Sequence, residues 1–185
     1  MRVVGGKLGG RRLASPPGRA LRPTSERVRE AVFNILEHGV DGFAIEGARV
    51  LDLFAGTGAW GLEALSRGAR FCLFIDDGAE ARGLIRRNAD ALGLIGQCKI
   101  WRRDAARLGP CAPRPPYGLI IADPPYGQDL ATRALQSLSE GGWMEPGAVV
   151  VVEESDRVEI TVPAGLQRID ARSYGDTKIL FLRAA

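Results

Sequence analysis

Between Arg49 and Val152 the chain alternates short apolar runs with stretches of helical periodicity, and this alternation is the strongest constraint on its fold. The predicted strands are 50–53, 71–75, 98–101, 119–122 and 149–152, and the predicted helices among them are 61–66, 80–92 and 131–138. Strands that alternate with helices in this way form a mostly parallel sheet with helices on both faces. The sequence therefore predicts an α/β domain.

The pattern changes after Glu153. Three apolar segments, 158–162, 167–171 and 179–182, follow one another without an intervening helix, and Gly175 lies between the last two. Consecutive strands separated by a glycine-containing turn are typical of antiparallel pairing. The sheet is expected to end in an antiparallel hairpin around Gly175.

The segment from Met1 to Arg29 is strongly basic, although the whole chain of 185 residues has a net charge of only +3. Its single acid is Glu26, and its basic residues are Arg2, Lys7, Arg11, Arg12, Arg19, Arg22, Arg27 and Arg29. Clustered basic side chains are the electrostatic signature of a polyanionic partner. A solvated arginine-rich leader without a partner is the alternative. We expect this segment to bind nucleic acid.

Residues 1–23 are predicted to form a basic arm, in which a small β-hairpin over 1–13 is followed by a proline-rich linker, and residues 24–185 to form the main domain. Thr24 or Ser25 is predicted to cap a helix with Val28, Val32, Ile35 and Leu36 on its apolar face. The amides at that helix N-terminus could also hold an anionic group. The candidate substrate-binding residues of this region are Arg2, Lys7, Arg11, Arg12, Arg22, Thr24 and Arg27.

Composition argues against several other classes. No run approaches the roughly 18 apolar residues of a membrane span, and no apolar segment of a signal peptide follows the basic N-terminus. We expect a cytoplasmic protein without a membrane partner. Cys72, Cys98 and Cys111 form neither an even disulfide framework nor a CxxC pair, and His38 lies where a helix C-terminal cation is ordinary. No metal site is expected.

The tetrapeptide Asp123-Pro124-Pro125-Tyr126 directly follows the apolar strand 119–122. The prolines stop that strand, so the tetrapeptide lies at the carboxyl edge of the sheet, where open α/β folds bind ligands. An acid, a stiff backbone and an aromatic face together suit a planar amine. Asp123 and the Pro124 carbonyl would accept its two N–H groups, and Tyr126 would stack on its ring. A proline-rich turn with a chance aromatic residue is the alternative.

A glycine-rich loop follows the first predicted strand and opens a helix, and its glycines satisfy GxGxxG. A dinucleotide enzyme would place a pyrophosphate there, but Asp52 would repel it. The Asp52 carboxylate can instead pair with a cationic amino group, such as the methionine ammonium of S-adenosylmethionine. The candidate cofactor-binding residues of the loop are Asp52, Phe54, Ala55, Gly56, Thr57 and Gly58.

Two further acids follow neighbouring strands. Asp76 comes after 71–75 and can accept hydrogen bonds from ribose hydroxyls, and Asp104 follows 98–101 and could accept from an adenine amine. Each acid alone could equally cap a turn or a helix. Because the carboxyl ends of parallel strands share one edge, we expect Asp52, Asp76, Asp104 and Asp123 to surround one cofactor site.

The glycine loop together with Asp-Pro-Pro-Tyr resembles class I S-adenosylmethionine-dependent methyltransferases that modify exocyclic amines. Further segments are similar to the RsmD family, the bacterial 16S rRNA guanine-N2 methyltransferases, and the resemblance covers nearly the whole chain. These segments are Arg2-Val3-Val4-Gly5-Gly6, Leu21-Arg22-Pro23-Thr24 with Arg27-Val28-Arg29-Glu30, Gly61-Leu62-Glu63-Ala64-Leu65-Ser66-Arg67-Gly68 and Tyr174-Gly175-Asp176-Thr177. Asp76 departs from the glutamate that relatives often carry, and Trp60 occupies a variable position.

The resemblance implies a Rossmann-like fold with a seven-stranded sheet and S-adenosylmethionine as cofactor. It implies methyl transfer to a guanine N2 amine of 16S rRNA on an assembling 30S particle, and we expect a monomer. Asp123, Pro124 and Tyr126 would be catalytic, and Pro125 would contact the substrate.

Three other functions fit parts of the sequence. A DNA adenine-N6 or cytosine-N4 methyltransferase shares both core motifs, but the chain has no obvious target-reading insertion. A non-catalytic RNA-binding relic of the fold has no need of the acid at Asp123, and a nicotinamide-dependent oxidoreductase is disfavoured by Asp52.

Overall fold

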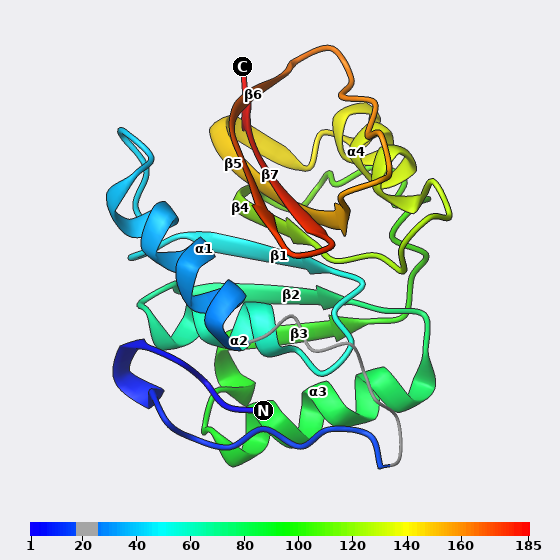
Figure 1. Cartoon of the computed structure of the whole chain (residues 1–185). Helices are drawn as coiled ribbons and strands as arrows, with labels where there is room; N and C mark the ends of the chain where they lie inside the picture. Colours follow the sequence, from blue (N-terminus) through cyan, green and yellow to red (C-terminus); the bar gives the residue numbers. More distant parts are fainter. Residues whose placement is uncertain (18–25) are drawn as a thin grey trace.

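The computed structural model describes residues 1–17 and 26–185, and its centre is a seven-stranded sheet in the order β3-β2-β1-β4-β5-β7-β6 (Figure 1). Strands β1 to β5 are mutually parallel, and β7 is antiparallel to both β5 and β6. The strands are β1 (Arg49–Leu53), β2 (Phe71–Ile75), β3 (Cys98–Trp101), β4 (Tyr117–Ala122), β5 (Met144–Ser155), β6 (Leu166–Tyr174) and β7 (Thr177–Ala184). The predicted parallel sheet with an antiparallel terminal hairpin is confirmed.

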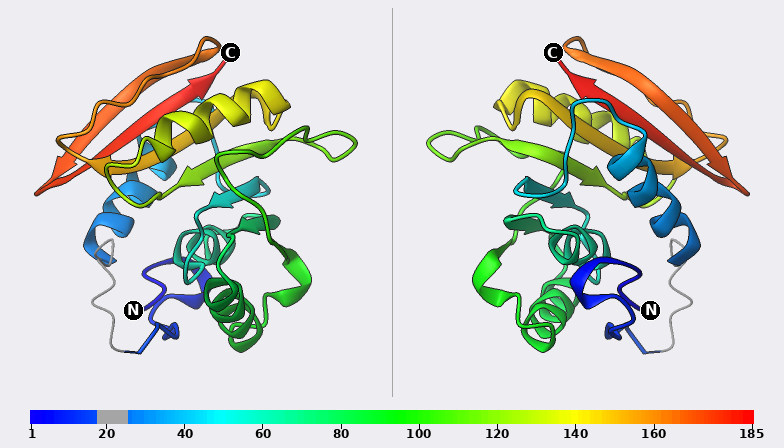
Figure 2. Two further views of the ribbon diagram at one scale, coloured as in Figure 1. Left: turned by 90° about the vertical axis from the view of Figure 1, so that its right-hand side faces the viewer. Right: turned by 90° about the vertical axis from the view of Figure 1, so that its left-hand side faces the viewer.

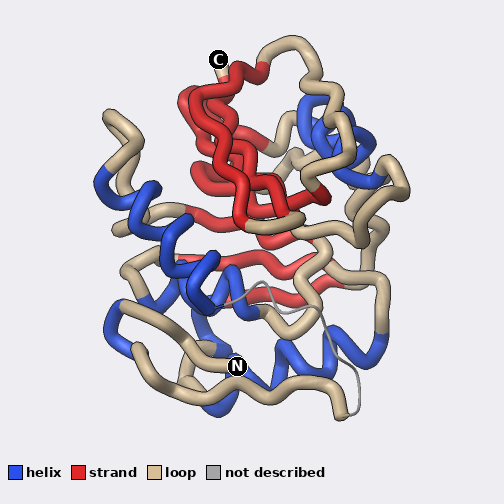
Figure 3. Tube along the Cα trace, in the orientation of Figure 1, coloured by secondary structure: helices blue, strands red, loops and turns tan. Residues whose placement is uncertain are grey.

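Helices cover both faces of this sheet, and the strands occupy the middle of the molecule (Figures 2 and 3). The helices are α1 (Glu26–His38), α2 (Ala59–Ser66), α3 (Ala79–Ala91) and α4 (Leu130–Gly141), with short 3-10 turns η1 (Gly6–Leu8) and η2 (Ile95–Gln97). Successive strand residues point to opposite faces. Val50 therefore packs in the cluster that contains α1, α2 and α3, and Leu51 in the cluster that contains α4.

Helix α2 packs directly on β2, and the absence of a side chain at Gly61 allows this contact. A Cβ atom at Gly61 would collide with the Phe74 ring and the Cys72 thiol on β2. The third glycine of a GxGxxG pattern has this packing role in nucleotide-binding folds. The close contact draws the N-terminus of α2, and the loop before it, down onto the ends of the strands.

The N-terminal segment, residues 1–17, is less regular than the β-hairpin that the sequence predicts. A single antiparallel bridge joins Arg2 to Arg12 around η1. Val3 and Leu13 are buried in the same cluster as α1, α2 and α3. Short, glycine-rich apolar stretches have too few cross-strand partners to extend a ladder, and the segment instead packs on the helices. The division into an arm of 1–23 and a domain of 24–185 stays a prediction.

Glu63 on α2 anchors this segment. Its buried carboxylate accepts the backbone N–H groups of Val4 and Gly5 at 2.8 and 2.7 Å, and the Arg67 guanidinium at 3.0 Å. Arg29 on α1 adds an ion pair at 3.4 Å. Because a buried carboxylate is stable only when it is well paired, these four donors explain its place in the core.

Residues 158–162 were predicted as a strand, and this prediction was wrong. The segment is an irregular connection between β5 and β6. Ile160 and Val162 pack against the α4 cluster, and the Thr161 N–H donates to the Thr132 hydroxyl on α4 at 3.2 Å. Alternating apolar residues thus pack on a helix here without pairing in the sheet. Among residues 1–17 and 26–185, no helix is long and apolar enough to cross a membrane.

Candidate active site

A cavity of about 610 Å³ opens at the carboxyl ends of the central strands. The loops after β1, β2 and β4 meet in its wall, as the sequence predicts for a ligand site in an open α/β sheet. The predicted site residues in this wall are Phe54, Ala55, Gly56, Thr57, Asp76, Asp123, Pro124, Pro125 and Tyr126. One cavity therefore unites the glycine loop with the Asp-Pro-Pro-Tyr tetrapeptide.

Asp76 holds the glycine loop in place. One carboxylate oxygen accepts the Gly56 N–H at 2.9 Å, and the other accepts the Gly78 N–H at 2.8 Å. The loop takes left-handed backbone angles at Phe54, Gly56 and Gly58, with φ of 55°, 56° and 80°. Such angles strain a non-glycine residue such as Phe54, and strained residues of this kind concentrate at functional sites.

The structure does not bring Asp52 to the cavity wall. Its carboxyl is fully buried, and one oxygen accepts the Gly61 N–H at 2.9 Å, while the other has no hydrogen-bond partner among the described residues. Burial raises the pKa of Asp52 well above its usual value, and the nearby Asp123 and Asp76 add to the rise. Asp52 thus anchors the turn into α2. Its predicted contact with a bound ammonium stays a prediction.

Two more predicted cofactor residues lie outside the wall. Asp104 is exposed, and its carboxylate accepts the Ala106 N–H at 2.8 Å in the turn after β3. Gly58 is buried behind the loop, where its N–H donates to the Ala55 carbonyl at 2.7 Å. Of the four acids expected around one site, Asp76 and Asp123 line the cavity.

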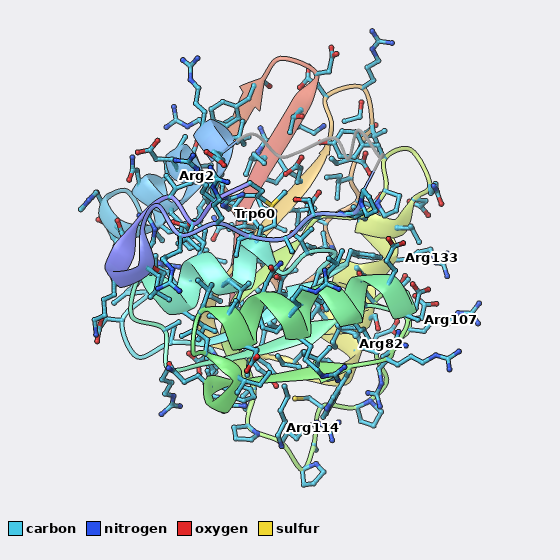
Figure 4. All side chains as sticks on the ribbon, turned by 90° about the horizontal axis from the view of Figure 1, so that it is seen from below. Arg2, Trp60, Arg82, Arg107, Arg114 and Arg133 are labelled. Carbon is cyan, nitrogen blue, oxygen red and sulfur yellow. The ribbon has the colours of Figure 1, made fainter. Side chains whose placement is uncertain are left out.

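Trp60 is a neighbour of Asp123 that sequence reasoning treated as a variable position. Its indole N–H donates to a carboxylate oxygen of Asp123 at 3.2 Å, and its ring packs against Phe33 with centroids 6.0 Å apart. Trp60 is only 4% exposed at the start of α2 (Figure 4). A buried indole N–H normally requires a hydrogen-bond acceptor. A tryptophan in an apolar helix directly after the glycine loop could therefore have predicted a polar partner near the cavity.

Tyr126 is held by residues from two other strands. Its hydroxyl donates to Glu153 on β5 at 2.6 Å and lies 3.1 Å from the hydroxyl of Thr177 at the start of β7. Burial, followed by the hydrogen bond to Glu153, raises the pKa of Tyr126. Glu153 also lines the cavity. It is an acid at the end of a buried valine run, the same signal that singled out Asp52 and Asp76, and it was missed.

Asn88 on α3 was also missed. Its amide donates to the Thr57 carbonyl at 2.9 Å and to the Ala14 carbonyl at 3.1 Å, and it accepts the Ala14 N–H at 2.7 Å. Asn88 therefore ties the N-terminal segment to the glycine loop. A buried asparagine on a helix face gives no signal in the sequence, because its partners are distant backbone groups.

The basic residues differ in their environments. Arg29 is buried, and burial lowers its pKa. It donates to the Arg2 carbonyl and to Glu63, so it ties the N-terminal segment to α1 and α2. The candidate substrate residues Arg2, Lys7, Arg11, Arg12 and Arg27 are exposed. Arg22 and Thr24 lie outside the described residues. Arg107 and Arg133 project from another side of the molecule than Arg2 (Figure 4).

Comparison with known proteins places the chain in a family. The family model "Conserved hypothetical protein 95" matches residues 1–183. "Ribosomal RNA small subunit methyltransferase D" of Escherichia coli (strain K12) is 36% identical over 170 residues, 89% of this chain and 80% of that protein. The protein of the same name from Haemophilus influenzae is 32% identical, over 87% of this chain and 82% of that protein.

Solved structures show the same fold. The structure of yhhF from Escherichia coli is 28% identical, with a TM-score of 0.83 over 100% of this chain and 97% of that chain. A magnesium protoporphyrin IX methyltransferase from Synechocystis, solved with bound SAM, shares the fold at 16% identity and a TM-score of 0.63, over 86% of this chain and 79% of that chain. With a family model matched over nearly its whole length, the chain belongs to the RsmD family of methyltransferases.

Proposed function

We propose that this protein transfers a methyl group from S-adenosylmethionine to the exocyclic N2 amine of a guanine in 16S rRNA, on an assembling 30S particle. The observation that carries the proposal is the shared cavity, in which Asp123, Pro124 and Tyr126 stand beside the glycine loop and Asp76. Relatives named small-subunit rRNA methyltransferases support the RNA substrate.

The cavity suits S-adenosylmethionine by size and by charge. Its volume of about 610 Å³ falls within the range of roughly 300–1,000 Å³ that is typical of small-molecule sites. Among the described residues, its wall carries the basic side chain of Arg29 and five acidic side chains, those of Asp76, Asp77, Glu80, Asp123 and Glu153. This excess of carboxylates favours a cationic cofactor and disfavours a pyrophosphate. Asp76 and the loop residues 54–57 would hold the cofactor, which supplies an electrophilic methyl group when bound.

The chain's own residues would position the amine. A guanine amine is a weak nucleophile because its lone pair is delocalised into the ring, so orientation and electrostatics must supply most of the rate. Asp123 would accept one N–H of the amine and the Pro124 carbonyl the other, which aims the lone pair and stabilises positive charge developing on nitrogen. Tyr126 would stack on the extruded base, and its hydrogen bonds to Glu153 and Thr177 would keep the ring in place.

Transfer of labelled methyl groups from S-adenosylmethionine to undermethylated 30S particles, compared with purified 16S rRNA, tests this proposal. We expect one modified guanine, mapped by mass spectrometry of the digested RNA. Asp123→Ala should abolish transfer while S-adenosylmethionine affinity stays close to that of the wild type. Turnover by Asp123→Ala at the wild-type rate, or methylation of adenine or cytosine in DNA alone, would refute it.

A further inference from the structure

Glu153 occupies a position in the cavity that anchoring of Tyr126 alone does not explain. It follows Val152, which pairs with Ala122 across the parallel strands β5 and β4. Asp123 directly follows the end of β4 and Glu153 continues β5, and neighbouring strands in a sheet lie about 4.8 Å apart. Both line the cavity. Two carboxylates from neighbouring strand ends thus line the same cavity, at the end where the base is proposed to bind.

The carboxylate of Glu153 is buried and oriented. Glu153 is 4% exposed, and one of its oxygens accepts the Tyr126 hydroxyl at 2.6 Å. The phenol has one proton, so the Thr177 hydroxyl, 3.1 Å away, donates to the Tyr126 oxygen in turn. This hydrogen bond fixes the direction of the carboxylate, whose two oxygens together carry several acceptor positions.

The donors and acceptors of the bases make this arrangement selective. Guanine carries two neighbouring donors, N1–H and the N2 amine. Adenine has an acceptor, N1, beside its N6 amine, and cytosine has an acceptor, N3, beside its N4 amine. A carboxylate next to the amine site therefore accepts a hydrogen bond from N1–H of guanine. With adenine or cytosine, the same carboxylate faces the lone pair of a ring nitrogen, so the two acceptors repel each other and both stay buried without a donor.

We infer that Glu153 is a specificity-determining residue that selects guanine by accepting its N1–H, while Asp123 accepts from the N2 amine. This inference rests on the proposed function and identifies the residue that would restrict methyl transfer to guanine. Accepting N1–H also shifts electron density toward the ring and the attached N2, which favours attack on the methyl carbon. The new N–C bond forms as the bond from that carbon to sulfur breaks, N2 then loses one proton to Asp123 or to water, and Glu153 takes no proton.

The test replaces the mapped target guanine with 2-aminopurine, which keeps the N2 amine but has an acceptor in place of N1–H. Single-turnover methyl transfer to the two RNAs is measured for the wild type, Glu153→Gln and Tyr126→Phe, in whichever substrate form the wild type methylates. The wild type should prefer guanine at least tenfold. In Glu153→Gln the side-chain amide can donate to N1 of 2-aminopurine, so this preference should disappear or reverse.

Tyr126→Phe removes the tether but keeps the Glu153 carboxylate, so it should retain the preference for guanine even where its rates fall. A ratio of two rates does not depend on the folded fraction, and S-adenosylmethionine affinity gives a separate check of the Glu153→Gln site. An unchanged preference in Glu153→Gln overturns the inference and leaves the proposed function intact. Failure of the wild type to methylate guanine overturns the proposed function itself.

Discussion

At the residue scale, the hydrogen bond from the Trp60 indole to Asp123 has a measurable consequence. Trp60→Phe keeps an aromatic ring but removes the donor that aims the carboxylate. A hydrogen bond to a charged group contributes about 1.5–3 kcal/mol, so we expect kcat to fall about tenfold or more, with little change in S-adenosylmethionine affinity. Stopped-time methylation assays and calorimetric titration with the cofactor measure the two quantities.

Trp143→Phe is the matched control. This indole N–H donates to the Gly109 carbonyl at 2.8 Å within the α4 cluster, away from the cavity. The control should lose stability but keep kcat. Equal kcat values for Trp60→Phe and the wild type would show that the bond to Asp123 does not contribute to catalysis.

Asp52 predicts a specific dependence of stability on pH. Burial raises its pKa in the folded protein, so proton binding favours the folded state. The contribution of Asp52 to the free energy of unfolding is greatest below the ordinary pKa of aspartate, and it is lost as pH rises through the raised pKa of the folded protein. Asp52→Asn keeps an oxygen for the Gly61 N–H and does not titrate. Relative to the wild type, the variant should gain about 1.4 kcal/mol per pH unit across that interval, measured by urea unfolding at several pH values. A pH-independent difference would contradict the burial argument.

At the scale of elements, the packing of α2 on β2 depends on Gly61, and α3 offers a matched comparison. Gly61→Ala should destabilise the protein by about 1–3 kcal/mol, because the new methyl group collides with Phe74 and Cys72. Gly83→Ala meets nothing within 4 Å in the interior of α3, and it should stabilise by up to about 1 kcal/mol through helix propensity. Thermal unfolding of both variants tests the pair, and effects of the same sign would be inconsistent with this packing.

At the scale of the whole molecule, exposed basic side chains on the N-terminal segment should dominate RNA affinity. Deleting the segment would confuse charge with folding, because Val3 and Leu13 are part of the core. The double variant Lys7→Gln/Arg12→Gln removes charge alone. It should weaken binding to 16S rRNA and reduce the slope of log affinity against log salt by about 0.7–0.9 for each phosphate that the variant no longer neutralises. Filter binding at several salt concentrations measures the slope.

The matched control for this experiment is Arg157→Gln/Arg168→Gln, which removes the same charge from exposed positions near β6. It should alter the slope much less. If both double variants change the slope equally, the partner responds to net charge, and the N-terminal segment is no specific RNA-binding site.

Much of the architecture followed from local patterns. Apolar runs between helical stretches predicted the parallel sheet, because strands that are covered by helices on both faces need apolar side chains at successive positions. Gly175 predicted the turn of the final hairpin. The same period-two pattern failed at 158–162, since Ile160 and Val162 alternate for packing on α4. Alternation reports which side chains are buried and does not report whether the backbone pairs.

Local patterns were also enough to order the chemical groups along the chain: a glycine loop after one strand, Asp76 after the next, and Asp123 with Tyr126 after a later one. Which acids reach the cavity depended on the packed fold, because a strand-end carboxylate can point into the core, as Asp52 does, or out to solvent, as Asp104 does. Folding also brought Trp60 to Asp123 and Glu153 to Tyr126. Those hydrogen bonds join residues 27 to 63 positions apart, and no local pattern encodes an interaction across that separation.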